Sequence, residues 1–246
     1  MSEPILSLDR VSKSFGGLAV LRELSFDVNQ GETESLVLGL IGPNGAGKTT
    51  VFNLISGLTK PDSGTIRFKG RKINGLAPEK ISRLGIARTY QIPQPFSNLT
   101  VRQNLLVASR YGASLGADEA EKQVSQVLDM TGLSDKEVIL AGYLTLLDRK
   151  RLELARALSN KPSLLLMDEI ASGLTEAEIP RLLEILQTIR KVGITTLLIE
   201  HSIQLVTKSA DLIVVIDGGS KLAEGKPKEI VALEEVIEAY LGKAVV

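Results

Sequence analysis

One eight-residue stretch constrains the fold of this chain more than any other. Residues 42–49 read Gly-Pro-Asn-Gly-Ala-Gly-Lys-Thr, which matches the spacing G-x-x-x-x-G-K-[ST]. Glycines at this spacing let successive backbone N–H groups point inward as an anion nest, and a helix that follows adds the positive end of its dipole. The apolar run 36–41 predicts a buried strand before the loop, and residues 50–55 have helical spacing after it. The sequence therefore predicts a nucleotide-phosphate loop.

The side chains of this loop have distinct expected roles. Lys48 is expected to reach the β- and γ-phosphates of ATP, and the Thr49 hydroxyl is expected to coordinate Mg²⁺. The expected nucleotide contacts of the loop are Asn44, Gly45, Ala46, Gly47, Lys48, Thr49 and Thr50.

Composition excludes several classes of protein. The chain has 246 residues, 43% of them apolar, which is enough to bury the core of one large α/β domain. Its 29 basic and 29 acidic residues balance, so we expect no nucleic-acid partner, and the lack of cysteine excludes a disulfide scaffold. No basic leader and no apolar run of about 20 residues is present, so we expect no signal peptide and no transmembrane segment. Any membrane role must then depend on a partner protein.

The periodicity of apolar residues changes along the chain. Residues 5–11 and 24–28 alternate apolar and polar, which predicts an antiparallel edge sheet with a turn near residues 16–17. Phe15, beside that turn, could stack on a base, although a single aromatic is more often part of a core. Continuous apolar runs at 163–167, 194–199 and 212–216 predict buried strands, as in a parallel sheet. Between residues 99 and 142 the spacing is helical, which predicts an inserted helical segment.

Four polar residues lie at the ends of predicted strands: Gln91 ends a strand predicted over residues 86–91, Asp168 and Glu169 end the run that starts at 163, and His201, the only histidine, ends the run that starts at 194. In a parallel sheet these positions share the edge where the phosphate loop lies. There Asp168 would hold Mg²⁺ through water, and Glu169 would polarise the water that attacks the γ-phosphate. Gln91 would bond to metal or water, and His201 would donate to the γ-phosphate. Surface residues that merely cap strands would explain any one of the four, but explain all four poorly.

Together these motifs resemble the nucleotide-binding subunits of ABC transporters, across essentially the whole chain. Residues 85–96 and 236–242 further look like those of branched-chain amino-acid importer ATPases. The segments that carry the resemblance are residues 42–49 as Walker A, Gln91 as the Q-loop, residues 164–169 as Walker B with the catalytic glutamate, residues 172–174 as the D-loop and His201 as the switch histidine.

The resemblance implies an α/β fold of the P-loop NTPase class. It has a RecA-like parallel core sheet, an antiparallel β subdomain and an inserted α-helical subdomain. We expect residues 1–246 to form a single ABC-type ATP-binding domain, with the helical subdomain at 92–143 and a C-terminal helical tail at 226–246. Phe15 would occupy the adenine-stacking position.

The resemblance also implies an activity and partners. It implies an ATPase that uses ATP and Mg²⁺ to power an importer, by dimer closure coupled to a membrane permease. The helical subdomain around Gln91 would receive a coupling helix of the permease. The second ATP-binding subunit would be an identical chain or a paralogue, and the subunits would lie peripherally on the cytoplasmic face of the inner membrane.

One motif departs from the family pattern. The signature motif, typically L-S-[YG]-G-Q, closes over the γ-phosphate bound by the other subunit, but residues 144–148 here read Leu-Thr-Leu-Leu-Asp. Thr145 keeps a hydroxyl, Leu147 prevents the close approach that a glycine allows, and Asp148 brings negative charge. At ~4 Å and an effective dielectric near 20, that repulsion is about 4 kcal/mol. We therefore expect low ATPase activity from a homodimer, and one competent site in a pair with a paralogous subunit.

Smaller departures are Ile170, where the family has proline, Thr175 in the D-loop, and extra residues around 33–35. Two alternatives stay open: the ATPase of another ABC system, such as lipopolysaccharide export or urea uptake, and an ATP-binding regulatory subunit that hydrolyses little.

Overall fold

The computed structural model describes residues 3–30, 35–200 and 202–241. The chain divides into two compact units. The first combines residues 1–78 with residues 195–246, and the second consists of residues 79–194. Each unit is described by itself below.

The first unit opens with an antiparallel sheet. Its first two strands form a hairpin that turns at Gly16 and Gly17, with Leu6 opposite Val28, as the alternating pattern predicted. Leu8 is opposite Phe26 and both are buried, so one face of the sheet is apolar. The strand order is β2-β1-β4-β5, with β1 (Leu6–Phe15), β2 (Leu18–Val28), β4 (Ser63–Phe68) and β5 (Arg71–Lys72).

The same unit holds the predicted parallel strands. The strand β3 (Val37–Ile41) pairs in parallel with β8 (Thr195–Ile199) and with β9 (Leu212–Asp217). Every residue of β3 and β8 is buried, which explains why these strands are continuous apolar runs in the sequence. The strand β10 (Ser220–Gly225) returns antiparallel to β9 after the turn at Gly218 and Gly219.

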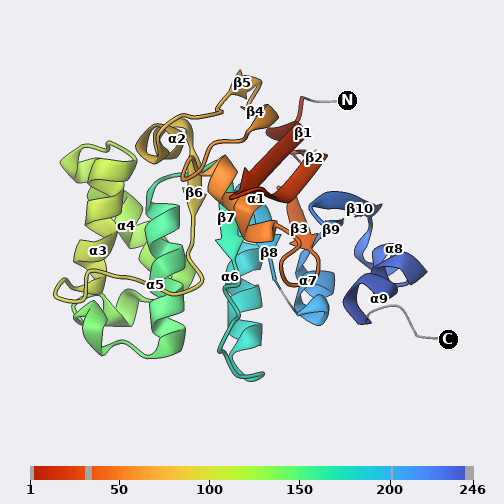
Figure 1. Ribbon diagram of the computed structural model, residues 1–246. Helices are drawn as coiled ribbons and strands as arrows, with labels where there is room; N and C mark the ends of the chain where they lie inside the picture. Colours follow the sequence, from red (N-terminus) through yellow and green to blue (C-terminus); the bar gives the residue numbers. More distant parts are fainter. Residues whose placement is uncertain (1–2, 31–34, 201, 242–246) are drawn as a thin grey trace. The chain divides into compact units, whose positions relative to one another are not determined.

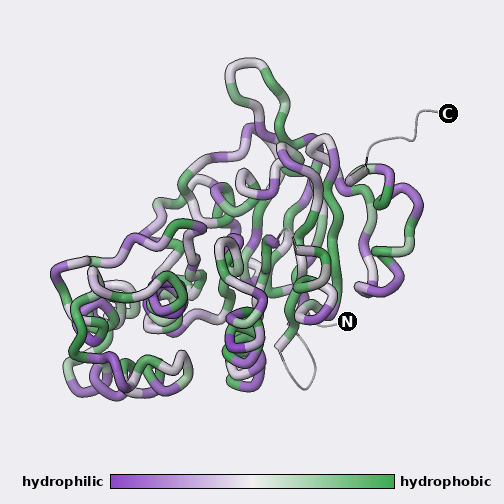
Figure 2. The backbone as a smooth tube through the Cα atoms, turned by 90° about the horizontal axis from the view of Figure 1, so that it is seen from below, coloured by the Kyte–Doolittle hydropathy of each residue, from purple (hydrophilic) through white to green (hydrophobic). Residues whose placement is uncertain are grey.

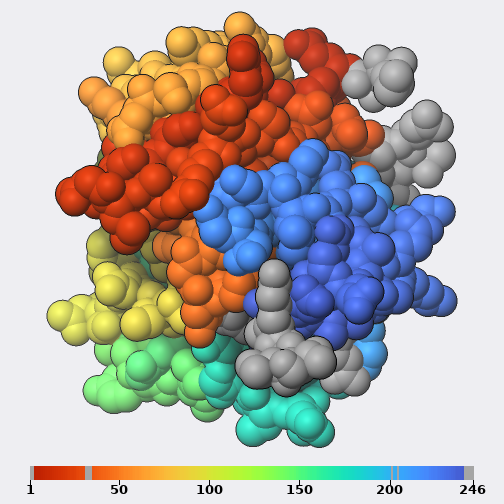
Figure 3. Space-filling view, turned by 45° about the vertical axis from the view of Figure 1, so that its right-hand side comes forward, coloured from red at the N-terminus to blue at the C-terminus, as the bar shows by residue number. Residues whose placement is uncertain are grey.

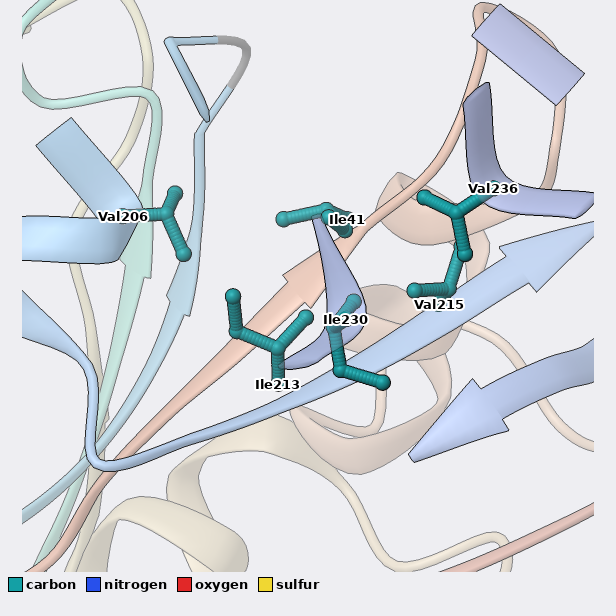
Figure 4. Close-up of a cluster of buried hydrophobic side chains, with 6 residues drawn as sticks. All are labelled: Ile41, Val206, Ile213, Val215, Ile230 and Val236. Carbon is teal, nitrogen blue, oxygen red and sulfur yellow. The ribbon is translucent and has the colours of Figure 1, made fainter. Parts of the chain in front are cut away.

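Short helices complete the first unit: α1 (Lys48–Ile55), α7 (Ile203–Ser209), α8 (Pro227–Ile230) and α9 (Glu234–Leu241). Six side chains from β3, α7, β9, α8 and α9 form a buried cluster (Figure 4): Ile41, Val206, Ile213, Val215, Ile230 and Val236. The C-terminal segment, blue in Figure 3, lies against the red N-terminal strands, where Arg22 N donates to Gly219 O at 2.9 Å. The turn between β9 and β10 therefore packs against β2 within the first unit.

The second unit is mainly helical. Its strands β6 (Ile86–Arg88) and β7 (Leu164–Asp168) are parallel, and α3, α4 and α5 lie side by side (Figure 1). The helices are α2 (Pro78–Leu84), α3 (Val101–Val107), α4 (Ala117–Thr131), α5 (Leu146–Ser159) and α6 (Ile179–Lys191). The helix α2 starts at the boundary of the units, and a π-helical turn at Ala108–Gly112 continues α3. Short 3₁₀ turns lie at Ser134–Lys136 and Ala141–Tyr143. The α/β class with parallel and antiparallel strands is thus confirmed, whereas the bounds 92–143 and 226–246 stay predictions.

Helix and strand ends differ from the sequence expectation at two places that border predicted motifs. The pattern Thr175-x-x-Glu178 predicts a capping box that opens a helix, but α6 begins only at Ile179, because Pro180 fits only the first turn of a helix. The strand β6 ends at Arg88, although Thr89 N still donates to Leu166 O at 2.9 Å. Gln91 therefore lies in a loop beyond the strand.

Hydropathy follows this architecture. Figure 2 shows helices along which hydrophilic and hydrophobic residues alternate, as expected for helices with one face on a core and the other in solvent. Among residues 3–30, 35–200 and 202–241, no helix has the length and apolar character needed to cross a bilayer.

Candidate functional site

The predicted phosphate loop lies between β3 and α1 and requires glycine at two positions. Gly42 and Gly47 have φ of 154° and 105°, a region that L side chains rarely adopt. A Cβ at Gly42 would lie 2.0 Å from Ile216 O, and one at Gly47 would lie 2.6 Å from Leu21 Cδ2. A side chain at Gly42 would collide with the backbone, and at Gly47 the positive φ makes any other residue strained even if Leu21 shifts.

The loop encloses the ammonium group of Lys48. Only 6% of this residue is exposed, and its Nζ donates to Gly42 O at 2.6 Å and to Pro43 O at 2.9 Å. The first turn of α1 leaves the N–H groups of Thr49 and Thr50 without an acceptor inside the helix. A buried cation beside these amides is a suitable site for a phosphate anion.

The other residues predicted in the first unit have the following environments. Asn44, Gly45 and Thr49 are exposed, and Ala46 is buried. Phe15 ends β1 with 48% of its surface exposed, and Lys13 Nζ lies 5.3 Å from the centre of its ring. The ring is therefore accessible to a ligand. His201 falls outside the described residues.

In the second unit, Asp168 is the last residue of β7 and forms a buried ion pair. Arg88 Nη2 lies 2.7 Å from Asp168 Oδ2, and each side chain is only 7% exposed. Removal of one partner of such a pair leaves an uncompensated buried charge, which is strongly destabilising. Arg88 thus fixes the orientation of Asp168, a contact that the sequence analysis missed.

Glu169 follows Asp168 with a backbone conformation that is uncommon for its residue type. Its φ is 45°, in the left-handed region. Gln91 Nε2 donates to Glu169 Oε2 at 2.5 Å, so the structure brings these two predicted site residues together. Strain of this kind persists only where surrounding contacts hold the residue, and such positions cluster at functional sites.

Lys150 helps to hold the backbone of Glu169 in its left-handed conformation. It lies in the second turn of α5 and is only 3% exposed. Its Nζ donates to Gln91 O at 3.0 Å and to Glu169 O at 3.3 Å. One ammonium group therefore ties both predicted site residues to α5. The sequence shows Lys150 only as the middle of a basic run, which more often marks a solvated surface.

The segment predicted to be an altered signature, residues 144–148, leads into the start of α5. Thr145 is the N-cap residue: its hydroxyl accepts the N–H of Asp148 at 3.2 Å and donates to Asp148 Oδ2 at 2.9 Å. Asp148 is only 4% exposed, and its carboxylate also binds Lys136 Nζ at 2.6 Å and Arg151 Nη1 at 3.1 Å. The negative charge of Asp148 is therefore held at the N-terminus of its own helix, which favours anions.

The ionisation of Asp148 reflects these contacts. Burial alone would raise the pKa of this carboxyl group, but the hydrogen bonds from Lys136 and Thr145 and the charges of Lys136 and Arg151 outweigh burial and lower the pKa. Asp148 is thus an anion at neutral pH, with two compensating cations in the same subunit. The repulsion of about 4 kcal/mol estimated for an unpaired carboxylate is consequently an upper limit.

Two protein families match the sequence. The family described as ABC transporter matches residues 21–172, and the family described as branched-chain amino acid ATP-binding cassette transporter matches residues 220–246.

Relatives match over nearly the full length. The high-affinity branched-chain amino acid transport ATP-binding protein LivG of Salmonella typhimurium is 38% identical, with 99% of this chain and 100% of the relative covered. BraF of Pseudomonas aeruginosa, which carries the same description, is also 38% identical with the same coverage.

Solved structures agree with this relationship. An ATP-binding cassette of an ABC transporter in its ADP conformation has a TM-score of 0.89 and 31% identity, with 98% of this chain and 100% of that chain covered. A nucleotide-free ATP-binding cassette has a TM-score of 0.85 and 28% identity over the same shares. The predicted P-loop NTPase fold is confirmed.

Proposed function

The chain belongs to the ATP-binding cassette family of ABC transporters, and from that premise we propose that it is the ATP-hydrolysing subunit of an importer for branched-chain amino acids. The observation that carries the cargo class is the match of residues 220–246 to the branched-chain family, a segment outside the part that matches ABC transporters in general. The relatives of LivG and BraF type support the same assignment.

We propose the following roles for the site residues. The loop residues 44–50 hold the phosphates of ATP, with Lys48 as the cation, and Phe15 stacks on the adenine. Glu169 activates the attacking water, and Gln91 orients Glu169 through their hydrogen bond. His201 contacts the γ-phosphate.

The side chains proposed to bind Mg²⁺ carry the kinds of oxygen donor that this ion prefers. Thr49, Gln91 and Asp168 offer a hydroxyl, an amide and a carboxylate, which are the oxygen donors that Mg²⁺ prefers. Bound with ATP, the ion would neutralise charge that develops on the phosphates. The task of the protein is to hold these donors, and the Arg88 ion pair fixes the orientation of the carboxylate.

The proposed partners follow from the family. The subunit would act peripherally on the cytoplasmic face of the inner membrane, bound to permease subunits that carry the cargo. It would form a dimer with a second ATP-binding subunit around two nucleotides.

We further propose that the start of α5 is a poor signature for the nucleotide of the partner subunit. Asp148 already occupies the helix N-terminus with its own carboxylate, and Leu147 adds a side chain where the family has glycine. A homodimer would then hydrolyse ATP slowly. A paralogous partner with a complete signature would restore one site, built from this phosphate loop and that signature.

Purification from native membranes tests the proposed function. A tagged chain is expected to retain a permease, and the reconstituted complex with its cognate binding protein should import radiolabelled leucine in proteoliposomes when ATP is inside. Lys48→Ala should abolish uptake. Uptake of urea without leucine would overturn the cargo assignment, and leucine uptake without ATP turnover would overturn the role of an ATPase.

Substitution of Lys150 by methionine should reduce the ATPase kcat of the purified complex about tenfold. Methionine keeps the apolar length but leaves the carbonyl groups of Gln91 and Glu169 without the ammonium donor, so the position of Glu169 loosens. Steady-state ATPase at saturating ATP measures this effect.

Arg149→Met is the matched control, because Arg149 is an exposed neighbour that donates to Gly142 O at 2.8 Å and contacts neither site residue. Equal kcat in the Lys150 variant and the control would contradict the proposed restraint.

A further inference from the structure

The C-terminal helix α9 makes a direct hydrogen bond to the first residue of the phosphate loop. Gly42 N donates to the Oη of Tyr240 at 2.7 Å, although 198 positions separate the two residues in the sequence. Gly42 is buried, so its N–H needs a hydrogen-bond partner, and the phenol supplies one. We propose that Tyr240 is a positioning residue that fixes the phosphate loop for nucleotide binding. This inference rests on the proposed role of the loop.

Two hydrogen bonds and the surrounding packing restrict Gly42. Its N–H donates to Tyr240 Oη, its carbonyl accepts from Lys48 Nζ at 2.6 Å, and the space beside its Cα is so narrow that an added Cβ would lie 2.0 Å from Ile216 O. Rotation of Gly42 about its backbone bonds would move the carbonyl and with it the Lys48 ammonium. The phenol therefore acts on the phosphate-binding cation through one residue.

One buried side chain in each of α8 and α9, Ile230 and Val236, anchors the helix that carries the phenol. Val236 and Ile230 belong to the buried cluster that includes Ile41, the last residue of β3 before the loop (Figure 4). Tyr240 packs against the same cluster and is partly buried. Burial raises the pKa of the Tyr240 hydroxyl, while the bond from Gly42 opposes that rise, so the phenol stays neutral at physiological pH.

Tyr240 lies in the segment that matches the branched-chain family, residues 220–246. Through the hydrogen bond to Gly42, this C-terminal segment stabilises the phosphate loop. By linkage, a group that stabilises the binding-competent loop must itself be stabilised when nucleotide binds.

Tyr240→Phe tests the proposal, because it removes one oxygen and keeps the ring in the cluster. We expect the Kd for ATP, measured by titration of the purified chain, to rise about tenfold, which is the upper range for one lost neutral hydrogen bond. The kcat of the transport complex at saturating ATP should change less than about twofold, since Tyr240 contacts no reacting group.

The matched control is Ile230→Val, which trims the same cluster and leaves the phenol in place. It should lower the melting temperature without changing the Kd. Equal affinities in wild type and Tyr240→Phe would overturn the inference, whereas a wild-type chain that binds no ATP would overturn the proposed function instead.

Hydrogen exchange of the wild-type chain gives a second measurement that needs no variant to fold. ATP should slow exchange of the α9 amides, residues 234–241, because binding strengthens the contact between Tyr240 and Gly42. Exchange in α9 that is unchanged by saturating ATP would count against the coupling even if the phenylalanine variant could not be purified.

Discussion

Glu169→Gln is expected to reduce the ATPase kcat by about 10²- to 10⁴-fold, the usual contribution of a general base, while ATP binding stays intact. Glutamine has the size of glutamate and still offers Gln91 an oxygen acceptor, so the change removes mainly the basic oxygen. The phosphate loop with Lys48 belongs to a different unit of the chain and keeps its own contacts. Single-turnover hydrolysis by the variant should therefore be slow, whereas its equilibrium affinity for ATP should equal that of wild type.

Glu176→Gln is the control for this experiment, because Glu176 is exposed and lies only seven positions further along the chain. It should hydrolyse ATP like wild type. Unchanged hydrolysis in the Glu169 variant would remove this residue from the role of base, and loss of ATP binding would indicate a structural role instead.

The combined substitution Leu147→Gly with Asp148→Gln is expected to raise the ATPase rate of the homodimer about tenfold. It removes the carboxylate that occupies the start of α5 and the side chain that prevents close approach of a phosphate. A tenfold gain corresponds to about 1.4 kcal/mol. This is well below the upper limit for an unpaired carboxylate, because Lys136 and Arg151 already compensate most of the charge of Asp148.

Added Glu169→Gln in the same background should abolish the gain, which shows that the measured activity belongs to this chain. Melting curves are needed beside it, since loss of the ion pairs of Asp148 weakens the start of α5, although Thr145 still caps the helix. Equal and robust turnover of wild type and the combined variant would mean that the altered motif is a competent signature.

Local features of the fold and site could be predicted from the sequence because they follow from short-range chemistry. The phosphate loop is predicted from its glycine spacing, and the strand β7, which ends at Asp168 directly before Glu169, is predicted from its continuous apolar run. The hairpin at Gly16 and Gly17 follows from alternation. The structure confirmed the hairpin, the strand β7 and the strand and helix on either side of the loop, whereas phosphate binding by the loop stays a prediction.

The missed features depend on contacts between distant positions. Arg88 and Asp168 are 80 residues apart, and Gly42 and Tyr240 are 198 apart, so no local pattern connects them. Asp148 is a different case. The sequence predicted its negative charge correctly. The orientation of its carboxylate depends on the ion pair with Lys136, which lies outside the signature segment and so was not part of that prediction.

The left-handed backbone of Glu169 has a consequence for laboratory evolution. A non-glycine residue held in a sparsely populated region costs of order 1 to 3 kcal/mol, and glycine or asparagine would remove much of that cost. Selection for heat resistance alone would therefore favour replacement of the very side chain proposed to activate water. Libraries screened for robust protein should hold position 169 constant, or they will enrich well-folded subunits that no longer turn over ATP.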